Sequence, residues 1–268
     1  MNAPTPDLRI VMTSALFPHE ETDSQRLEPL VERIRNEPYI INPPIVAPID
    51  AERFVILDGA NRCQAFARLN YPHSLVQVVS YYDGTVTLEN WQHVVCNWSA
   101  DALLEHLTDL SGIDLRYGRH ADAIAHIYCR DGRLIALHTA HHSLHDRNAA
   151  LRRVVSVYQR SAILQRTALS NPEEVWSLFD NGAALVVFPL YSPEDIIAAA
   201  REGALLPPGV SRHIVQGRAL KVHYSLDTLR DPTQSLHQKN VALRHWLQEK
   251  IARRQMRYYA EPTYQFDE

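Results

Sequence analysis

The sequence predicts an α/β fold with a mixed, α+β type of sheet, and three observations lead to this prediction. Short apolar runs typical of strands alternate with segments in which apolar residues recur at helical spacing. One such run, Val55–Leu57, ends at Asp58-Gly59 and passes directly into a helical pattern. The chain has 268 residues, of which 46% are hydrophobic, which is enough for one large core or two smaller ones. We therefore expect about two domains.

Composition disfavours several classes of protein. The net charge is −4 and there is no long basic run, which does not favour non-specific nucleic-acid binding. No apolar run approaches the length needed to span a bilayer, and residues 1–7 lack the parts of a signal peptide. Cys63, Cys96 and Cys129 show no Cys-x-x-Cys spacing, which is typical of reduced thiols. We expect a cytoplasmic protein.

Residues 1–82 are expected to form the first domain, a compact α/β unit. Pro18 disfavours a helix at its position, so His19 and Glu20 should lie on loop backbone. The expected elements are a strand at 8–12, a helix capped by Thr22 or Asp23, strands at 45–49 and 53–57, a helix from 60 to about 70 and a strand at 74–80.

Residues 83–268 are expected to form a second α/β domain that packs against the first and completes the substrate site. Asp131-Gly132 predicts a tight hairpin, and Pro172 suits the first position of a helix. The other expected elements are a strand around Val94, a helix capped by Ser99, strands at 113–115, 123–129 and 134–138, a helix capped by Asp146, a strand at 184–188, a helix at 192–203, a loop at 206–213, a strand at 218–226 and a helix at about 234–256.

The turn from Gly59 to Arg62 is a candidate phosphate site. A strand that turns at a glycine into a helix points the unpaired N–H groups of the helix at whatever lies above the turn. Arg62 lies in the first turn of that helix, where its guanidinium could bind the same anion. The alternative is an ordinary strand–turn–helix with a solvated arginine, because Gly-x-x-Arg is a short pattern.

Glu20 and Asp58 form the best candidate pair of acidic residues. Both stand at the ends of segments, where the loops on one face of a sheet converge. One carboxylate could deprotonate an acceptor hydroxyl while the other holds that hydroxyl or a metal-bound phosphate. The alternative for each residue is a helix cap or a surface charge.

Two further groups of residues have both a functional and an ordinary interpretation. Ser211-Arg212-His213 follows a proline-rich loop and could bind a carboxylate, or could simply connect a helix to a strand. Four histidines lie close together in the sequence and could hold a metal or haem, but we favour a solvated loop, so no metal ligand is assigned: His138, His141, His142 and His145.

The turn resembles a known superfamily. Gly59, Arg62 and Ala65 match the Gly-x-x-Arg-x-x-Ala signature of the ParB/sulfiredoxin superfamily, whose members bind nucleotide phosphates at this turn. Sulfiredoxin activity is disfavoured, because its reactive cysteine directly follows the motif glycine and Ala60 stands there. ParB-type segregation is disfavoured as well, since no convincing helix-turn-helix is visible and the net charge is acidic.

Within this superfamily the chain resembles the free L-serine kinases, the SerK and SbnI type. Pro18-His19-Glu20, together with Leu57-Asp58-Gly59 and Arg62, carries this resemblance, which is clear over residues 14–80 and weaker beyond. The family's two motif histidines are replaced here by Ala60-Asn61. Backbone N–H groups at these positions can still bind phosphate, but an asparagine cannot carry charge or shuttle a proton.

The resemblance implies a role for each matching residue. Glu20 is implied as the general base and Asp58 as a second catalytic residue. Nucleotide binding is implied for His19, Gly59, Ala60, Asn61 and Arg62, and substrate binding for Trp91, Ser211, Arg212 and His213. The last three resemble a family segment only loosely.

The leading hypothesis is a kinase that transfers a nucleotide's terminal phosphoryl group to free L-serine, giving O-phospho-L-serine. The resemblance implies Mg²⁺ with ATP or ADP, L-serine or a close analogue as substrate, and a product that feeds amino-acid or siderophore biosynthesis. The second hypothesis is a non-catalytic nucleotide-binding regulator, which the Ala60-Asn61 replacement favours. The third is a redox protein, which requires a low thiol pKa at Cys63.

Overall fold

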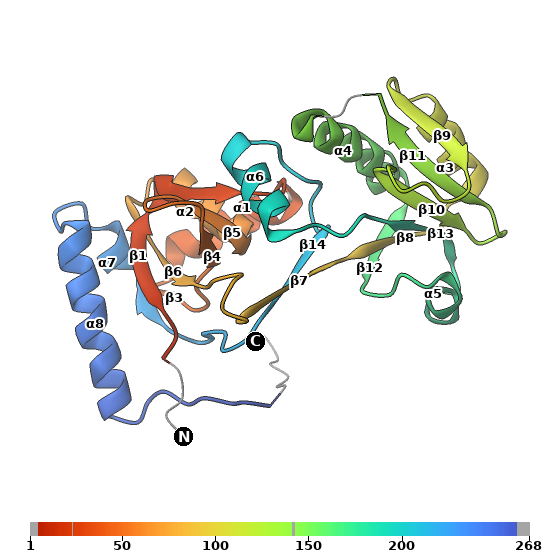
Figure 1. The fold of residues 1–268 in the computed structure, drawn as a ribbon. Helices are drawn as coiled ribbons and strands as arrows, with labels where there is room; N and C mark the ends of the chain where they lie inside the picture. Colours follow the sequence, from red (N-terminus) through yellow and green to blue (C-terminus); the bar gives the residue numbers. More distant parts are fainter. Residues whose placement is uncertain (1–4, 23, 141–142, 262–268) are drawn as a thin grey trace. The chain divides into compact units, whose positions relative to one another are not determined.

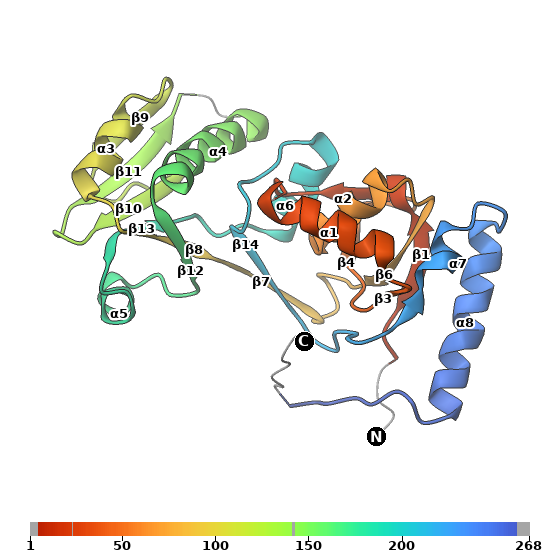
Figure 2. The same cartoon turned by 180° about the vertical axis from the view of Figure 1, so that it is seen from behind.

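The structure is a computed structural model that describes residues 5–22, 24–140 and 143–261 (Figures 1 and 2). The contacts among its residues divide the chain into two compact units. Unit 1 contains Met1–Phe17, Thr22–Thr87 and Ile214–Glu268, whereas unit 2 contains Pro18–Glu21 and Leu88–His213. Each unit is therefore built from separated stretches of sequence.

Unit 1 is built mainly from the two ends of the chain. Its elements, of which β2 and β7 also include residues of unit 2, are β1 (Leu8–Met12), the 3₁₀ helix η1 (Thr13–Ala15), β2 (Leu16–Pro18), α1 (Ser24–Asn36), β3 (Tyr39–Ile40), β4 (Ile45–Pro48), β5 (Phe54–Asp58), α2 (Ala60–Arg68), β6 (His73–Val78), β7 (Val86–Asn90), β15 (Tyr224–Ser225), α7 (Leu226–Arg230) and α8 (Leu236–Ala252).

A mixed five-stranded sheet, in the order β1-β6-β4-β5-β2, organises unit 1. β4 runs parallel to β6, while the β1–β6 and β4–β5 pairs are antiparallel. The apolar faces of α1 and α2 pack in one core with β1 and β6, through residues such as Leu27, Phe66 and Leu75. A separate cluster that includes Val46 and Val76 is formed from the same sheet. The sheet places the end of β5 and the start of α2 beside each other, as the sequence predicts.

Helix α8 protects the edge strand β1, beside which it lies in Figure 1. The side-chain amide of Asn240 accepts a hydrogen bond from the N–H of Ile10 at 3.0 Å and donates one to its carbonyl at 2.8 Å. The buried ammonium of Lys239 donates to the carbonyls of Leu229 and Asp231 and lies 3.0 Å from Nδ1 of His73. The two bonds of Asn240 satisfy main-chain groups of Ile10 that an open sheet edge leaves unpaired.

Unit 2 is built around the middle of the chain. Its elements, of which β14 extends into unit 1, are β8 (Gln92–Cys96), α3 (Ala100–Thr108), β9 (Ile113–Tyr117), β10 (Ala125–Cys129), β11 (Leu134–Thr139), α4 (Leu144–Ser161), β12 (Ile163–Thr167), α5 (Pro172–Leu178), β13 (Gly182–Val187), α6 (Pro193–Glu202) and β14 (Ser211–Val215).

The six-stranded sheet of unit 2, in the order β12-β8-β13-β10-β11-β9, is antiparallel at every recorded pair. Leu103 of α3 and Val154 and Tyr158 of α4 pack in its larger core. A smaller cluster contains Val175 of α5 with residues of β8 and β13. Strands β7 and β14 form a two-stranded sheet, and β3 and β15 form another.

Most predicted elements are present, and the differences have local causes. Strands β7 and β12 were not predicted, and Ser211–Val215 is a strand rather than part of a loop. The strand predicted over residues 218–226 is wrong, because the left-handed backbone at Lys221 and His223, with φ of 52° and 53°, interrupts it before the short β15.

The start of α4 also differs from the prediction. Ser143 caps this helix rather than Asp146, since the Ser143 side chain accepts a hydrogen bond from the Asp146 N–H at 3.1 Å. The cap predicted at Asp23 lies outside the described residues. Ser99 and Ser192 cap their helices where the sequence indicates, and Asn171 caps the helix that begins at Pro172.

The division into units differs from the predicted domain boundary after residue 82. Ile214–Glu268 belongs with unit 1, and the short stretch Pro18–Glu21 belongs with unit 2. Among the described residues, no helix is long and apolar enough to cross a membrane.

Candidate functional site

The start of α2 in unit 1 has the geometry that the glycine turn predicts. Gly59 is the N-cap residue with a left-handed φ of 91°, and no side chain caps the helix there. A Cβ atom at this position would lie 2.9 Å from Nη2 of Arg62 and 3.1 Å from Cβ of Pro44. The left-handed backbone therefore favours glycine here, and any larger residue would displace the Arg62 guanidinium.

Asp58 fixes two arginines at this turn. Its Oδ2 accepts a hydrogen bond from Nη2 of Arg62 at 3.2 Å and another from Nη2 of Arg218. The other terminal nitrogen of Arg62, Nη1, donates to the carbonyl of Asn42. Burial lowers the pKa of Arg62, and the charge of Asp58 acts in the opposite direction. We call Asp58, Gly59, Arg62 and Arg218 the arginine group; two guanidiniums on one carboxylate leave it with a net positive charge.

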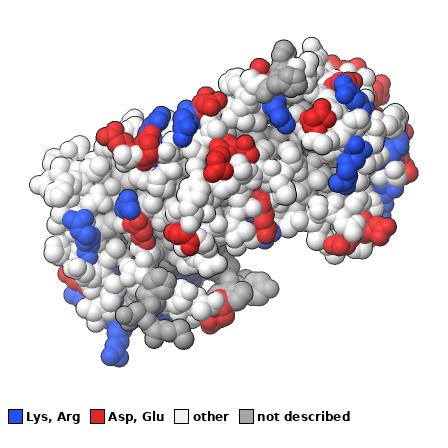
Figure 3. Space-filling model, viewed as in Figure 1, with Lys and Arg blue, Asp and Glu red and all other residues white. Residues whose placement is uncertain are grey.

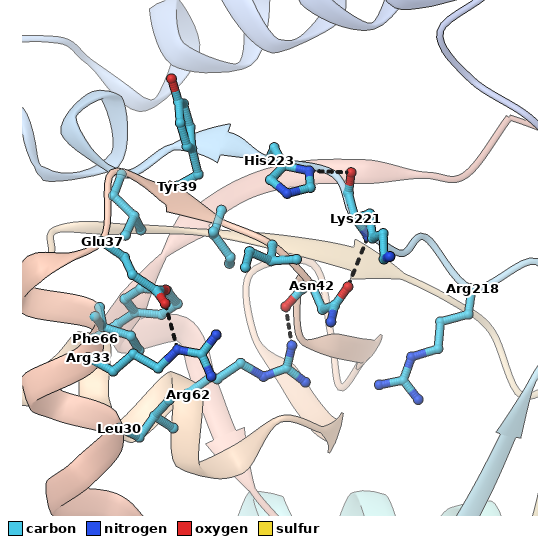
Figure 4. A pocket seen from close by; sticks show the side chains of 14 residues that line it. Leu30, Arg33, Glu37, Tyr39, Asn42, Arg62, Phe66, Arg218, Lys221 and His223 are labelled. Atoms are coloured by element: carbon cyan, nitrogen blue, oxygen red, sulfur yellow. Dashed lines mark hydrogen bonds and ion pairs between the residues drawn. The ribbon is translucent and has the colours of Figure 1, made fainter. Parts of the chain in front are cut away.

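A cavity of about 710 Å³ in unit 1 adjoins the arginine group (Figure 4). Arg62 and Arg218 line it, and in Figure 4 the Arg218 guanidinium points toward that of Arg62. Its wall combines apolar and polar side chains, among them Leu30, Phe66 and Tyr39. The cavity is within the size range of small-ligand sites, and half of its lining residues are polar or charged.

Ala60 and Asn61 occupy the first turn of α2 behind Gly59. The side-chain oxygen Oδ1 of Asn61 is buried and has no hydrogen-bond partner among the described residues. A buried acceptor without a partner carries a cost in free energy.

Glu20 of unit 2 is held by main-chain donors. Its Oε2 accepts the N–H of Gly209 at 2.7 Å, and its Oε1 accepts the N–H groups of Val210 at 3.1 Å and Ser211 at 2.6 Å. The Glu20 backbone itself forms a parallel bridge with Leu206. Three N–H groups converging on one carboxylate fix both its position and its orientation.

His19 lies beside Glu20 and is buried. Its Nε2 is 2.6 Å from Oγ of Ser211 and 3.7 Å from Oε1 of Glu20, and its ring meets the ring of His213 edge-on with the centroids 5.4 Å apart. We call His19, Glu20 and residues 209–211 the glutamate group. The predicted nucleotide-binding His19 thus lies in unit 2, in a different unit from Gly59–Arg62.

The predicted substrate-binding residues lie together in unit 2. The guanidinium of Arg212 stacks over the Trp91 ring at 4.6 Å from its centroid, and its Nη1 donates to Glu89 at 2.8 Å. Ser211 and His213 adjoin His19, as described above. The structure therefore brings Trp91, Ser211, Arg212 and His213 into the same unit as Glu20.

A redox role for Cys63 is not supported. Its side chain is buried, and burial raises the pKa of its thiol to about 12. A thiol held in its neutral form is a poor nucleophile. Cys96 and Cys129 are buried and unpaired as well.

The predicted histidine loop does not exist as one group in the described residues. His138 lies on β11, and His145 is exposed in the first turn of α4, contrary to the prediction that it precedes the helix. His141 and His142 lie outside the described residues. His138 instead lies beside two residues that precede β10, His120 and Asp122.

Comparison with known sequences points in one direction. No protein-family model matches the chain. Over 264 residues it is 23% identical to the ATP-dependent L-serine kinase SbnI of Staphylococcus aureus, and this match covers 96% of each of the two chains. It is also 32% identical over 99 residues to an ATP-dependent L-serine kinase of Staphylothermus marinus and 30% identical over 83 residues to one of Desulfurococcus mucosus. These two matches span only 39% and 32% of the archaeal proteins.

Solved structures agree with the sequences. A C-terminally truncated SbnI from Staphylococcus aureus matches 92% of this chain and 96% of its own, with a TM-score of 0.73 and 21% identity. A free serine kinase in complex with AMP matches 85% of this chain and 97% of its own, with a TM-score of 0.71 and 14% identity. The chain has the fold of the free serine kinases. The predicted mixed α/β fold and the predicted resemblance to these kinases are both confirmed.

Sequence reasoning missed three contributors to the two groups. Arg218 meets Asp58 across 160 residues of sequence, and Asn42 binds both Arg62 and the N–H of Lys221. No short-range pattern marks either residue. The amides of residues 209–211 are also invisible in a sequence, although Pro207-Pro208-Gly209 does mark a constrained loop.

Acidic and basic side chains are interspersed on the face of the molecule drawn in Figure 3. Among the described residues on this face, no continuous stripe of Lys and Arg is visible. Nucleic-acid recognition by this face is therefore disfavoured, in agreement with the net charge of −4.

Proposed function

We propose that this protein transfers the terminal phosphoryl group of ATP or ADP to the hydroxyl group of free L-serine, giving O-phospho-L-serine. The observation that carries the proposal is that both motif carboxylates, Glu20 and Asp58, are held by defined hydrogen-bond donors. Sequence likeness to the L-serine kinase SbnI along 96% of both chains supports the same reaction.

The arginine group is suited to the nucleotide phosphates. The uncapped start of α2 presents N–H groups, Arg62 and Arg218 supply positive charge, and Asp58 orients both guanidiniums. The adjoining cavity is large enough to take the rest of a nucleotide. In phosphoryl transfer, positioning and charge stabilisation provide most of the rate enhancement, so a small set of donors suffices.

A magnesium ion is compatible with this group. Mg²⁺ is usually held by one or two carboxylates together with substrate phosphates, so a single partly exposed carboxylate, that of Asp58, fits it. When bound, Mg²⁺ neutralises charge on the phosphate oxygens. Asp58 then has two tasks in our proposal, as a ligand and as the residue that positions Arg62 and Arg218.

Glu20 is proposed as the general base. A carboxylate has about four acceptor positions, and the three backbone N–H groups occupy three of them. The remaining position accepts the proton of the serine hydroxyl as the serine oxygen bonds to phosphorus. The bond from phosphorus to the bridging oxygen of the nucleotide breaks, and that oxygen leaves with the shortened nucleotide.

Arg212 and its neighbours are proposed to hold the amino acid. Glu89 engages one terminal nitrogen of Arg212 and the Trp91 ring supports its plane, so the remaining N–H donors of the guanidinium can bind the serine carboxylate. Ser211 and His213 lie next to the base and would contact the amino group. The three buried, unpaired cysteines are compatible with the reducing cytoplasm, where we propose that the enzyme acts.

A ³¹P NMR assay tests the proposal directly. The purified chain is incubated with Mg²⁺, L-serine and either ATP or ADP in separate tubes. We expect a phosphomonoester signal that depends on serine, and the tube in which it forms identifies the donor. Nucleotide binding without this product from either donor would contradict the kinase and would favour a regulator, and Asn61→His would then be the first variant to examine.

A further inference from the structure

Three side chains of unit 2 that the proposed kinase reaction does not use converge on one point. His138 lies on β11, while His120 and Asp122 lie in the connection from β9 to β10. Each offers one ligand atom, and these atoms all lie within 4.8 Å of one another. Among the described residues this is the one group of three or more such side chains with this geometry.

His138 supplies the buried side of the group. Its side chain is only 6% exposed, and its Nδ1 lies 3.4 Å from Oδ2 of Asp122. Its Nε2 is buried and has no hydrogen-bond partner among the described residues. A neutral imidazole carries a proton on one ring nitrogen and an acceptor lone pair on the other. If the proton is on Nδ1, the acceptor at Nε2 is unused. If the proton is on Nε2, the lone pair of Nδ1 faces a carboxylate. A cation between Nδ1 and Asp122 resolves the second situation, because it uses the Nδ1 lone pair and balances the carboxylate charge.

The distance between His138 and Asp122 suits a shared metal ion. With bonds of about 2.0–2.2 Å and tetrahedral angles, two ligand atoms of one zinc ion lie about 3.4 Å apart. That is the separation of Nδ1 and Oδ2 in this structure.

His120 is oriented as metal-binding histidines are. Its Nε2 lies 3.2 Å from the carbonyl of Tyr117, which is the position of a donated N–H, so Nδ1 keeps its lone pair. Its backbone N–H donates to Nε2 of His126 at 3.1 Å, and its ring meets that of His138 edge-on at 5.0 Å. Such second partners fix the ring and its tautomer in metal sites.

We propose that His120, Asp122 and His138 bind one divalent transition-metal ion, for which Zn²⁺ is the best fit. Two imidazoles with one carboxylate are typical of zinc and its neighbours, whereas Mg²⁺ and Ca²⁺ prefer sites made of oxygen alone. Three protein ligands leave a fourth position for water. The ion joins the β9–β10 connection to β11.

Metal binding is measured on the full chain, purified without a histidine tag and treated with EDTA. Zn²⁺ affinity is determined by competition with a chromophoric chelator, and the geometry of the site from the visible absorption of the Co²⁺ form. We expect one tightly bound equivalent of Zn²⁺ and the strong absorption of four-coordinate cobalt. Asp122→Asn and His120→Ala should each weaken Zn²⁺ binding by at least about tenfold and remove the cobalt bands.

Two variants serve as matched controls. Asp114 is an exposed aspartate on β9 that pairs with Arg116, and His106 is an exposed histidine on α3. Asp114→Asn and His106→Ala should bind Zn²⁺ as the unmodified chain does. Since Asp122 is 78% exposed, its replacement leaves the core intact, which a circular dichroism spectrum checks. The proposal fails if the unmodified chain binds less than one equivalent, or if Asp122→Asn binds with unchanged affinity.

Discussion

The glutamate group and the arginine group both fix a carboxylate, but by different means. Glu20 is held by three backbone N–H groups of one loop. Asp58 is held by the side chains of Arg62 and Arg218, which come from sequence positions 4 and 160 residues away. The side chain of Glu20 is 15% exposed and that of Asp58 is 43% exposed.

Of the two groups, only the arginine group depends on the identity of the side chains that hold its carboxylate. Backbone N–H groups are present whatever residues other than proline occupy positions 210 and 211, so the glutamate group depends on loop shape. The arginine group depends on two particular charges and is partly screened by salt. A base must be placed accurately, which suits main-chain donors, whereas the full positive charges that balance a phosphate come from side chains.

Removal of the Glu20 carboxylate should have the largest effect. Glu20→Ala should lower serine-dependent product formation by about 10²- to 10⁴-fold, the usual contribution of a general base, while nucleotide affinity changes little. Initial rates by ³¹P NMR and nucleotide titrations measure the two quantities. Glu21→Ala is the matched control, because that neighbouring glutamate pairs with Arg152 at 2.9 Å and has no proposed catalytic role. Equal loss in both variants would contradict the role of Glu20.

Acid should weaken the loop that holds Glu20. His93 is buried against Tyr158 and the carbonyl of Gly209, and burial lowers its pKa from 6.5 to about 4. The unfolded chain therefore binds this proton at a higher pH than the folded chain does. Stability is complete above pH 6.5 and is lost as the pH falls toward 4, by about 3 kcal/mol at most.

Urea unfolding at several pH values, followed by tryptophan fluorescence, measures this loss. Trp91, Trp98 and Trp176 all lie in unit 2, so the signal reports mainly on that unit. His93→Gln should flatten the dependence below pH 6.5. An unchanged slope in this variant would show that another group titrates.

The arginine group should respond most to loss of Arg218. Arg218→Ala should weaken nucleotide binding by about 10- to 100-fold, the usual contribution of a hydrogen bond between charged groups, and should reduce its salt dependence. Calorimetric titrations at two salt concentrations measure both effects. Arg68→Ala removes another exposed arginine of unit 1, one that pairs with Glu28, and should leave binding unchanged. Similar affinities for the two variants would contradict the proposed clamp.

The smallest effect is expected at Gly59. Gly59→Ala should cost about 1–2 kcal/mol of stability from its left-handed backbone and should weaken nucleotide binding several-fold by displacing Arg62. Gly203→Ala is a matched control, since Gly203 has a φ of 67° and open space where a Cβ would lie. Thermal unfolding should show similar losses for both, whereas only Gly59→Ala should alter nucleotide affinity. A Gly59→Ala chain with normal affinity would show that Arg62 is free to move.

Local signals in the sequence predicted what local physics determines. The turn at Gly59, the hairpin at Asp131-Gly132 and the caps at Ser99 and Ser192 are all where the sequence places them. Each depends on residues within about one helical turn of each other. The residues of each of the two family motifs also lie close together in the sequence.

Long-range partners were not predictable from the sequence. Arg218 lies in an irregular segment, and only the tertiary fold brings it to Asp58. The alternation that suggested a strand around Val222 and Tyr224 reflects apolar side chains packed into the core of unit 1, while the backbone between them is left-handed. Burial, rather than strand pairing, produces the pattern there.

The interleaving of the two units has a consequence for synthesis on the ribosome. Unit 2 has all its residues once the chain has reached His213, whereas unit 1 still lacks Ile214–Glu268, and with it Arg218 and α8. Domains generally fold as units while the chain emerges. The loop that holds Glu20 can therefore form first, while β1 waits with an unprotected edge for Asn240. A nascent chain stalled shortly after residue 213 would expose this edge to aggregation and to chaperones.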